Sequence, residues 1–219
     1  MLVGIHYKDS SKKIGLTYRR IRKSPAKKPD AMQYLDKKAD LKTLQGLADT
    51  NLLDLVYFDE SGITKNPDIT SCWQIQKEPT FSLPSATNRK RISMLGFLNV
   101  AKQTLRGYTT TDKVDSAFVI SIMSDYANTI TKRTVVVLDN ASFHKSRRFK
   151  EHISKWQEKG LYLFYLPPYS PQLNPIEILW RFIKQEWINL NAYLSFDALY
   201  SYIDNVFSGY GTKYVIDFG

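Results

Sequence analysis

From residue 52 onward, the sequence alternates between short apolar runs of strand length and longer segments with helical spacing. The runs predict strands at residues 52–58, 91–100, 103–109, 134–138 and 161–166. The longer segments predict helices at residues 114–128, 146–159, 175–190 and 196–207. The resulting order of strand, hairpin, helix, strand, helix, strand, helix predicts an α/β fold, in which helices flank a mixed sheet.

Three acidic residues accompany these segments. Asp59 and Asp139 each directly follow an expected strand, and Glu177 lies near the start of an expected helix. Functional groups in such folds gather beyond the carboxyl ends of parallel strands. Hard oxygen ligands at that edge suit Mg²⁺, which leaves room for phosphate oxygens. The pattern therefore predicts a metal site built from separate elements.

The first acid has a neighbour that competes with it. Asp59 and Glu60 are adjacent, so on an extended chain their side chains point to opposite faces. Both faces of the preceding strand are apolar, and the alternation therefore does not choose between the two acids. Either one could also be a solvated residue at a strand end.

The other two acids also have ordinary alternatives. Asp139 is followed by Asn140, which fits a turn that leaves the strand. Glu177 falls three residues after Asn174, with Pro175 between them, as in a capping box at a helix start. However, four prolines within residues 167–175 stiffen the approach to Glu177, which suits a ligand that needs fixed geometry.

Together the three acids suggest phosphoryl transfer with two metal ions. Two Mg²⁺ ions about 3.5–4 Å apart can clamp the attacking and leaving oxygens of an in-line displacement. Mn²⁺ is the expected substitute. Without metal, clustered carboxylates repel one another and resist full ionisation.

The basic residues are unevenly distributed. The chain has a net charge of +10, and residues 1–48 hold 12 Lys and Arg against 4 Asp and Glu. Such a block is typical of contact with nucleic-acid phosphates, although a solvated tail has the same composition. We divide the chain into a basic segment with a linker, residues 1–50, and a larger domain, residues 51–219. The candidate DNA contacts are Arg19, Arg20, Arg22, Lys23, Lys27, Lys28, Arg147 and Arg148.

Several features bear on the compartment. Cys72 is the only cysteine, so no intrachain disulfide can form. The first residues lack the apolar core of a signal peptide. The longest apolar runs are far shorter than the roughly 20 residues of a membrane helix. We expect a cytoplasmic, nucleoid-associated protein without a membrane partner.

Three blocks of sequence carry a family resemblance. FDES, VVVLDNASFHKS and LPPYSPQLNPIEILW resemble the catalytic blocks of mariner-superfamily DDE transposases, especially the prokaryotic insertion-sequence branch. The resemblance implies an RNase H-like fold with Asp59, Asp139 and Glu177 as the triad. The spacing of 37 residues between the last two is toward the long side for the family. A histidine is frequent in the family at the position of His144, which places it near the metals.

The resemblance also implies a reaction and partners. Members cleave DNA at transposon ends and join the 3′-hydroxyl to target DNA, typically at TA. They carry N-terminal helix-turn-helix units, of which residues 1–50 retain at most the tail. We therefore expect a truncated member whose partners are transposon-end and target DNA, a second copy assembled on DNA, and a helix-turn-helix subunit encoded separately.

Two other functions fit the same sequence. One is a non-catalytic DNA-binding regulator, which the basic N-terminal block suggests. The other is a structure-selective nuclease on the same fold, which would cleave DNA without joining a 3′-end.

Overall fold

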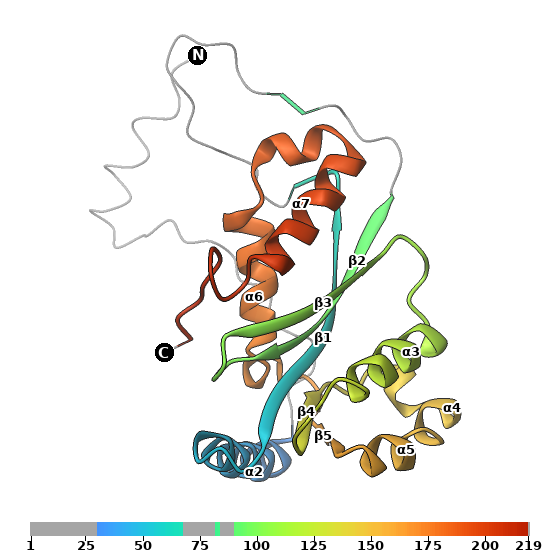
Figure 1. The fold of residues 1–219 in the computed structure, drawn as a ribbon, viewed down its shortest axis with the longest axis vertical. Coiled ribbons are helices and arrows are strands. Elements are labelled where there is room, and N and C mark those ends of the chain that lie inside the picture. The colour runs from blue at the N-terminus through green and yellow to red at the C-terminus, as the bar shows by residue number, and fades with distance from the viewer. Residues whose placement is uncertain (1–29, 68–81, 84–89, 219) are drawn as a thin grey trace, which may run out of the picture.

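One mixed sheet forms the centre of the molecule. The computed structural model describes residues 30–67, 82–83 and 90–218. Among these residues, five strands are arranged in the order β3-β2-β1-β4-β5 (Figure 1). They are β1 (Asp54–Thr64), β2 (Arg91–Asn99), β3 (Thr104–Thr110), β4 (Thr134–Leu138) and β5 (Leu161–Tyr165). Because β4 is parallel to both β1 and β5, these three strands have their carboxyl ends at the same edge.

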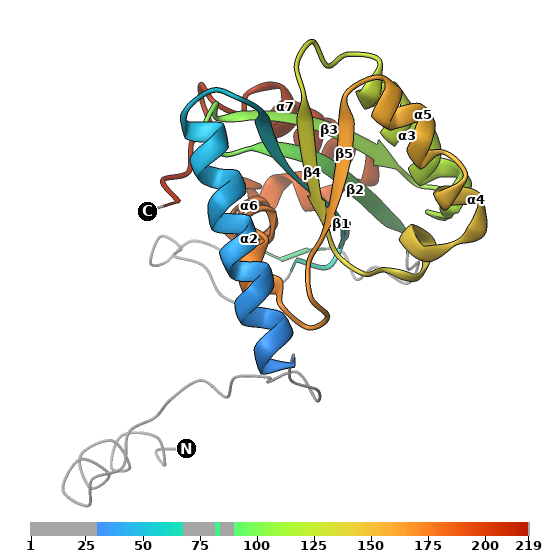
Figure 2. The same cartoon turned by 90° about the horizontal axis from the view of Figure 1, so that it is seen from below.

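Helices cover both faces of this sheet (Figures 1 and 2). The helices on one face are α3 (Ser116–Ala127), α4 (Arg147–Lys150) and α5 (Ile153–Glu158). Those on the other face are α2 (Ala31–Asp49), α6 (Ile176–Phe182) and α7 (Phe196–Ser208). The α/β architecture with a mixed sheet, expected from the order of segments, is confirmed.

Alternate side chains of β1 pack into two separate apolar cores. Leu55 and Tyr57 pack into the core beneath α6 and α7, whereas Val56 and Phe58 pack into the core beneath α3 and α5. Because successive side chains of a strand point to opposite faces, Asp59 continues on the side of Tyr57. The strand therefore directs Asp59 toward α6.

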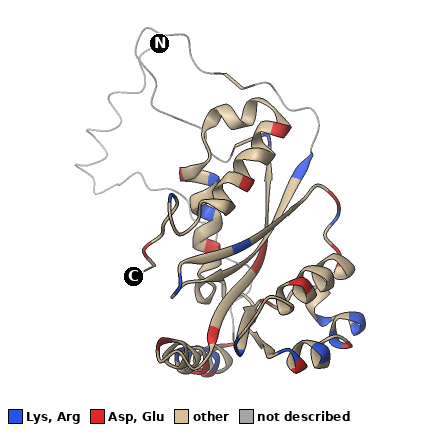
Figure 3. Ribbon diagram, in the orientation of Figure 1, with Lys and Arg blue, Asp and Glu red and all other residues tan. Residues whose placement is uncertain are grey.

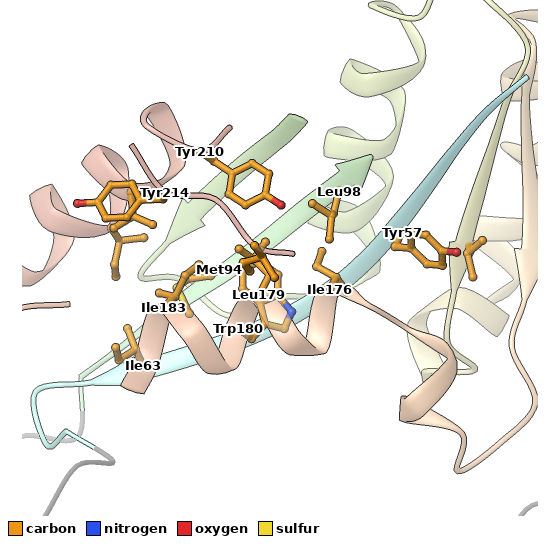
Figure 4. Packing of buried hydrophobic residues seen from close by; sticks show 14 of the residues in the cluster. Tyr57, Ile63, Met94, Leu98, Ile176, Leu179, Trp180, Ile183, Tyr210 and Tyr214 are labelled. Atoms are coloured by element: carbon orange, nitrogen blue, oxygen red, sulfur yellow. The ribbon is translucent and has the colours of Figure 1, made fainter. Parts of the chain in front are cut away.

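The helix α6 lies close to the sheet because of its own apolar stripe and a glycine opposite. The stripe facing the sheet is drawn in Figure 4 and consists of Ile176, Leu179 and Trp180, continued by Ile183 just after the end of α6. A Cβ atom on Gly96 of β2 would lie 2.9 Å from Cη2 of Trp180. Gly96 is also the register partner of Asp59. The absent side chain thus lets Trp180 approach the strand pair that carries Asp59.

The prediction that the first strand ends at residue 58 is wrong. β1 continues to Thr64 through antiparallel pairing with β2, from Tyr57 opposite Leu98 to Thr64 opposite Arg91. Asp59 therefore lies within a strand and not after one. This pairing joins segments distant in the sequence, so the local pattern could not reveal it.

Three helix boundaries also differ from expectation. The helix expected at 114–128 begins at Ser116, because Asp115 accepts a 2.8 Å hydrogen bond from the amide of Phe118. The helix expected at 146–159 is divided into α4 and α5 around His152, whose Nδ1 lies 2.9 Å from the carbonyl oxygen of Arg148. The helix expected at 175–190 ends in a π-helical turn, Ile183–Trp187.

The first described helix belongs to the folded body. Leu41 of α2 is 4% exposed and lies in the core beneath α6 and α7. Among the described residues, no helix is both long and apolar enough to cross a membrane.

Candidate active site

The side chain of Asp59 extends from β1 toward α6. Its Oδ2 accepts a hydrogen bond of 3.0 Å from the indole nitrogen of Trp180. Burial raises the pKa of Asp59 to about 8, and the nearby carboxylates of Glu177 and Asp139 add to the rise. The backbone of Glu60 and the indole of Trp180 oppose it through hydrogen bonds. The carboxyl therefore favours its protonated form near neutral pH unless positive charge is supplied.

Asp139 lies just beyond β4, at the edge where parallel strands end. Its Oδ1 accepts a hydrogen bond of 3.0 Å from the amide of Ala141, and Nδ1 of His144 lies 3.1 Å from the same oxygen. Burial acts to raise the pKa of Asp139, but these hydrogen bonds and Lys145 hold it below its usual value. Asp139 is therefore the acid of the three that ionises most readily.

Glu177 projects from the first turn of α6. Burial raises the pKa of its carboxyl, Lys184 acts against the rise, and Asp139 adds to it. The capping box is not formed, because the start of α6 has no side-chain capping hydrogen bond. Only the backbone closes the turn, through a 3.0 Å hydrogen bond from the amide of Glu177 to the carbonyl of Asn174.

The three acids line one cavity of about 540 Å³. They reach it from β1, from the end of β4 and from α6, and their mutual effect on the pKa of Asp59 agrees with this proximity. The proline-rich loop after β5 forms another wall, with Pro167, Pro168 and Pro171. Lys145 also lines the cavity and brings a positive charge.

The donor set suits a hard divalent cation. Three carboxylates provide only oxygen ligands, and two of them have raised pKa values that a cation would offset. Among the described residues, no three His, Cys, Asp or Glu side chains are close enough to form a metal cage by themselves. Any bound ion would therefore also need oxygens from water or substrate, as Mg²⁺ commonly does.

Four residues close to the acids in the sequence, Glu60, Asn140, Asn174 and His144, are placed differently in the structure. Glu60 faces away from the other acids and pairs with Arg91 at 3.1 Å. Asn140 lines the cavity, and its Nδ2 donates to the carbonyl of Leu166, which ties the loop after β4 to the end of β5. Asn174 also lines the cavity and is 4% exposed, and its Oδ1 has no hydrogen-bond partner among the described residues.

His144 lies beneath the cavity and does not line it. It is 2% exposed, and its Nδ1 contacts Asp139. The structure thus brings together the three acids and places Asn140, Asn174 and His144 beside them.

Of the residues expected to contact DNA, the structure describes two. Arg147 and Arg148 are exposed on α4. Figure 3 shows that α4 and the nearby α5 both carry Lys or Arg positions. Arg147 pairs with Glu151 at 2.9 Å. The six N-terminal candidates between Arg19 and Lys28 lie outside the described residues.

Two neighbours of the acids have no role that the local sequence pattern predicts. The spacing of the expected helix at 175–190 places Trp180 on its apolar face, and its indole nitrogen also reaches Asp59. Its position three residues after Glu177 was the available signal. Lys145 received no role, although it directly follows His144 and lines the cavity.

A second groove adjoins the cavity. It measures about 510 Å³ and shares Pro171, Asn174 and Glu177 with the cavity. Arg181 and Phe218 form its outer part. A substrate longer than one phosphate group could therefore extend past Glu177.

The sequence that builds this fold and cavity matches a known protein family. A family model described as DDE superfamily endonuclease matches residues 54–200. This match covers more than half of the chain and includes all three acids. The chain belongs to the DDE superfamily endonuclease family.

One relative in Sinorhizobium fredii (strain NBRC 101917 / NGR234) is described as the uncharacterized protein y4pE/y4sA. It is 31% identical over 65 residues, which are 30% of this chain and 44% of the relative.

Solved structures of the Mos1 transposase share the fold. The paired-end complex with the left transposon end has a TM-score of 0.65 at 15% identity, covering 95% of this chain and 64% of that chain. The paired-end complex with Mn has a TM-score of 0.62 at 15% identity, covering 93% and 63%. The complex with Mg has a TM-score of 0.58 at 14% identity, covering 95% and 64%.

These similarities confirm the RNase H-like core that the three sequence blocks implied. The chain spans slightly less than two thirds of the length of those transposase chains.

Proposed function

We propose that this chain is the catalytic domain of a DNA transposase. It cleaves phosphodiester bonds at transposon ends and joins the resulting 3′-hydroxyl to target DNA, with TA as the target site. The observation that carries the proposal is that Asp59, Asp139 and Glu177 line one cavity from three separate elements. Membership in the endonuclease family and the Mos1 complexes with transposon-end DNA support it.

Two Mg²⁺ ions, with Mn²⁺ as a substitute, are the proposed cofactors. The Mos1 complexes with Mn and with Mg support this choice. Asp59, Asp139 and Glu177 would hold the ions, which would supply Lewis acidity for displacement at the phosphate. Asp139, ionised at neutral pH, offers the first negative charge, and Trp180 orients Asp59. The proline-rich loop fixes the wall against which the scissile phosphate is placed.

Charges near the acids fit a polyanionic substrate. Lys145 lines the cavity on the side of Asp139, and Arg181 lines the groove beyond Glu177. A DNA strand that passes through the cavity and the groove would have a cation on each side of the reacting phosphate. Arg147 and Arg148, exposed on α4, would contact phosphates farther along the strand.

The proposed partners follow from the same assignment. They are transposon-end and target DNA, a second copy of the chain assembled on DNA, and a separately encoded helix-turn-helix subunit. Residues 1–50 would contribute to DNA recognition, with Leu41 of α2 packed into the core of the catalytic domain formed by residues 51–219. We place the protein in the cytoplasm, associated with the nucleoid.

The test is a cleavage and joining assay with DNA that carries the ends of the element. Wild-type protein in Mg²⁺ or Mn²⁺ should nick the ends and transfer the 3′-hydroxyl to a second duplex. Cleavage without joining would assign a nuclease instead. Salt-dependent DNA binding without cleavage in either metal would assign a non-catalytic regulator.

A further inference from the structure

The hydrogen bonds that hold Asp139 all end on one oxygen of its carboxylate. The amide of Ala141 donates to Oδ1 at 3.0 Å, and Nδ1 of His144 lies 3.1 Å from Oδ1. Among the described residues, no hydrogen bond ends on Oδ2. Asp139 lines the cavity, so this arrangement leaves one carboxylate oxygen available for a ligand there.

The contacts of His144 indicate which of its nitrogens carries the proton. Nδ1 lies 3.1 Å from the backbone oxygen of Asp139 as well as 3.1 Å from its Oδ1, and both atoms are acceptors. Nε2 is buried and has no hydrogen-bond partner among the described residues. Because a donor left unpaired in an apolar site is costly, the proton belongs on Nδ1.

Aromatic side chains fix the orientation of the His144 ring. The ring centroid lies 4.5 Å from that of Phe143, 5.4 Å from that of Phe149 and 5.9 Å from that of Phe58. The hydroxyl of Tyr165 donates to the backbone oxygen of His144 at 3.4 Å, which joins this turn to β5. The ring therefore has a fixed place beneath the cavity.

We propose that His144 is a positioning residue of the catalytic centre. Its Nδ1–H, shared between the backbone oxygen and Oδ1 of Asp139, holds the carboxylate in the rotamer that presents Oδ2 to the cavity. The next residue, Lys145, lines the cavity directly, so one short 3₁₀ turn (Ser142–Lys145) supplies both a buried support and a surface cation. The inference rests on the proposed function insofar as Oδ2 is assigned to a metal ion.

Three substitutions separate positioning from simple packing. In His144→Asn, the side-chain amide nitrogen can occupy the place of Nδ1 and keep the donor. In His144→Gln, the amide nitrogen matches the place of Nε2 instead. His144→Phe fills the aromatic pocket but removes both nitrogens, so it should fold with a melting temperature close to that of the wild type.

The readout is the affinity for Mn²⁺, measured by titration calorimetry without DNA. His144→Phe and His144→Gln should bind Mn²⁺ about 10–100-fold more weakly, as expected when a residue that orients a metal ligand is removed. His144→Asn should stay within a few-fold of the wild type. Wild-type affinity in His144→Phe, or a better result for Gln than for Asn, would overturn the proposal.

A second measurement needs neither metal nor DNA. Nitrogen-15 spectra of the wild-type imidazole should show a protonated Nδ1 and an unprotonated Nε2. The opposite tautomer would overturn the positioning role even if the protein cleaves DNA. Conversely, the wild type could show the expected tautomer and yet neither bind Mn²⁺ nor cleave DNA. That result would refute the proposed function and the assignment of Oδ2 to a metal ion. The hydrogen bond from Nδ1 of His144 to Asp139 would still be established.

Discussion

The indole nitrogen of Trp180 donates a 3.0 Å hydrogen bond to Oδ2 of Asp59, which joins α6 to β1 across 121 positions of sequence. Trp180 is 2% exposed, and it lies against Gly96, the register partner of Asp59. Glu177 is on the turn of α6 just before Trp180. The contact therefore sets the position of the helix that carries Glu177 relative to the strand that carries Asp59.

Trp180→Phe should weaken metal binding. The change removes the indole donor from Asp59, and a lost partner of a metal ligand typically costs about 10–100-fold in affinity. The matched control is Trp156→Phe, because Trp156 is also 2% exposed and donates to Oγ of Ser124 at 3.0 Å. Both variants should lose about 1–3 kcal/mol of stability. Equal metal affinities in the two variants would contradict the role of Trp180.

Asp59→Asn should stabilise the metal-free protein at alkaline pH. Burial, together with the nearby carboxylates of Glu177 and Asp139, raises the pKa of Asp59 in the folded state from 3.8 to about 8. The folded state then keeps a proton that the unfolded chain releases, so the stability of the wild type falls as pH rises from about 4 to about 8. Asn does not ionise, so in EDTA the variant should melt above the wild type at pH 8 and close to it at pH 4.

The control for that experiment is Asp139→Asn. The pKa of Asp139 is lowered in the folded state. Its ionised form therefore stabilises the fold at pH values above the ordinary pKa of aspartate, and this stabilisation is lost as the pH falls. Asp139→Asn should therefore melt below the wild type near neutral pH. If both variants shift the melting temperature in the same direction at pH 8, the assigned environments are wrong.

Gly96→Ala should reduce both stability and cleavage. The new methyl group would lie 2.9 Å from Cη2 of Trp180 and 3.1 Å from Cδ1 of Leu105, which forces α6 away from β2. Overpacking of this kind costs about 1–3 kcal/mol. Gly46→Ala is the control, because a Cβ there meets no atom within 4 Å and alanine favours a helix by about 1 kcal/mol. Thermal unfolding of the two variants should shift in opposite directions.

Arg148→Ala should weaken DNA binding uniformly across sequences. If Arg148 contacts one phosphate, its loss should reduce the slope of log affinity against log salt by about 0.9. Lys102→Ala is the control, since Lys102 pairs with Asp54 at 2.7 Å near the start of β1 and away from the cavity. Fluorescence anisotropy over a salt series measures both slopes. An unchanged slope in Arg148→Ala would show that Arg148 of α4 does not contact a DNA phosphate.

The parts of the fold that the sequence predicted well are those defined by local pattern. Both bounds of the strand expected at Thr134–Leu138 are confirmed, because five buried side chains lie between polar turns. The hairpin of β2 and β3 lies within a residue or two of its expected bounds for the same reason. The extension of β1 to Thr64 depends on pairing with β2 and has no local signal.

The sequence predicted that the three acids lie together, and they line one cavity, but it did not predict every contact that supports them. Strand alternation alone leaves Asp59 and Glu60 equivalent, whereas in the structure Glu60 pairs with Arg91 and Asp59 accepts a hydrogen bond from Trp180. Glu177 fitted a helix cap equally well, since the capping pattern is local and the cavity is not. The contact of Trp180 with Asp59 joins elements 121 residues apart and has no local signal, whereas the family resemblance already implied that His144, five residues after Asp139, lies near the metals.

The most direct test of the account is cleavage of element-end DNA by the wild type and by Glu177→Gln in Mg²⁺ and in Mn²⁺. Glu177→Gln keeps the size of the side chain and removes the charge of the third acid. We predict nicking and 3′-hydroxyl joining by the wild type, and a loss of at least about 10²–10³-fold in the variant, the scale for removing one charge-stabilising group. Undiminished cleavage by Glu177→Gln, or no cleavage by the wild type in either metal, would contradict the account.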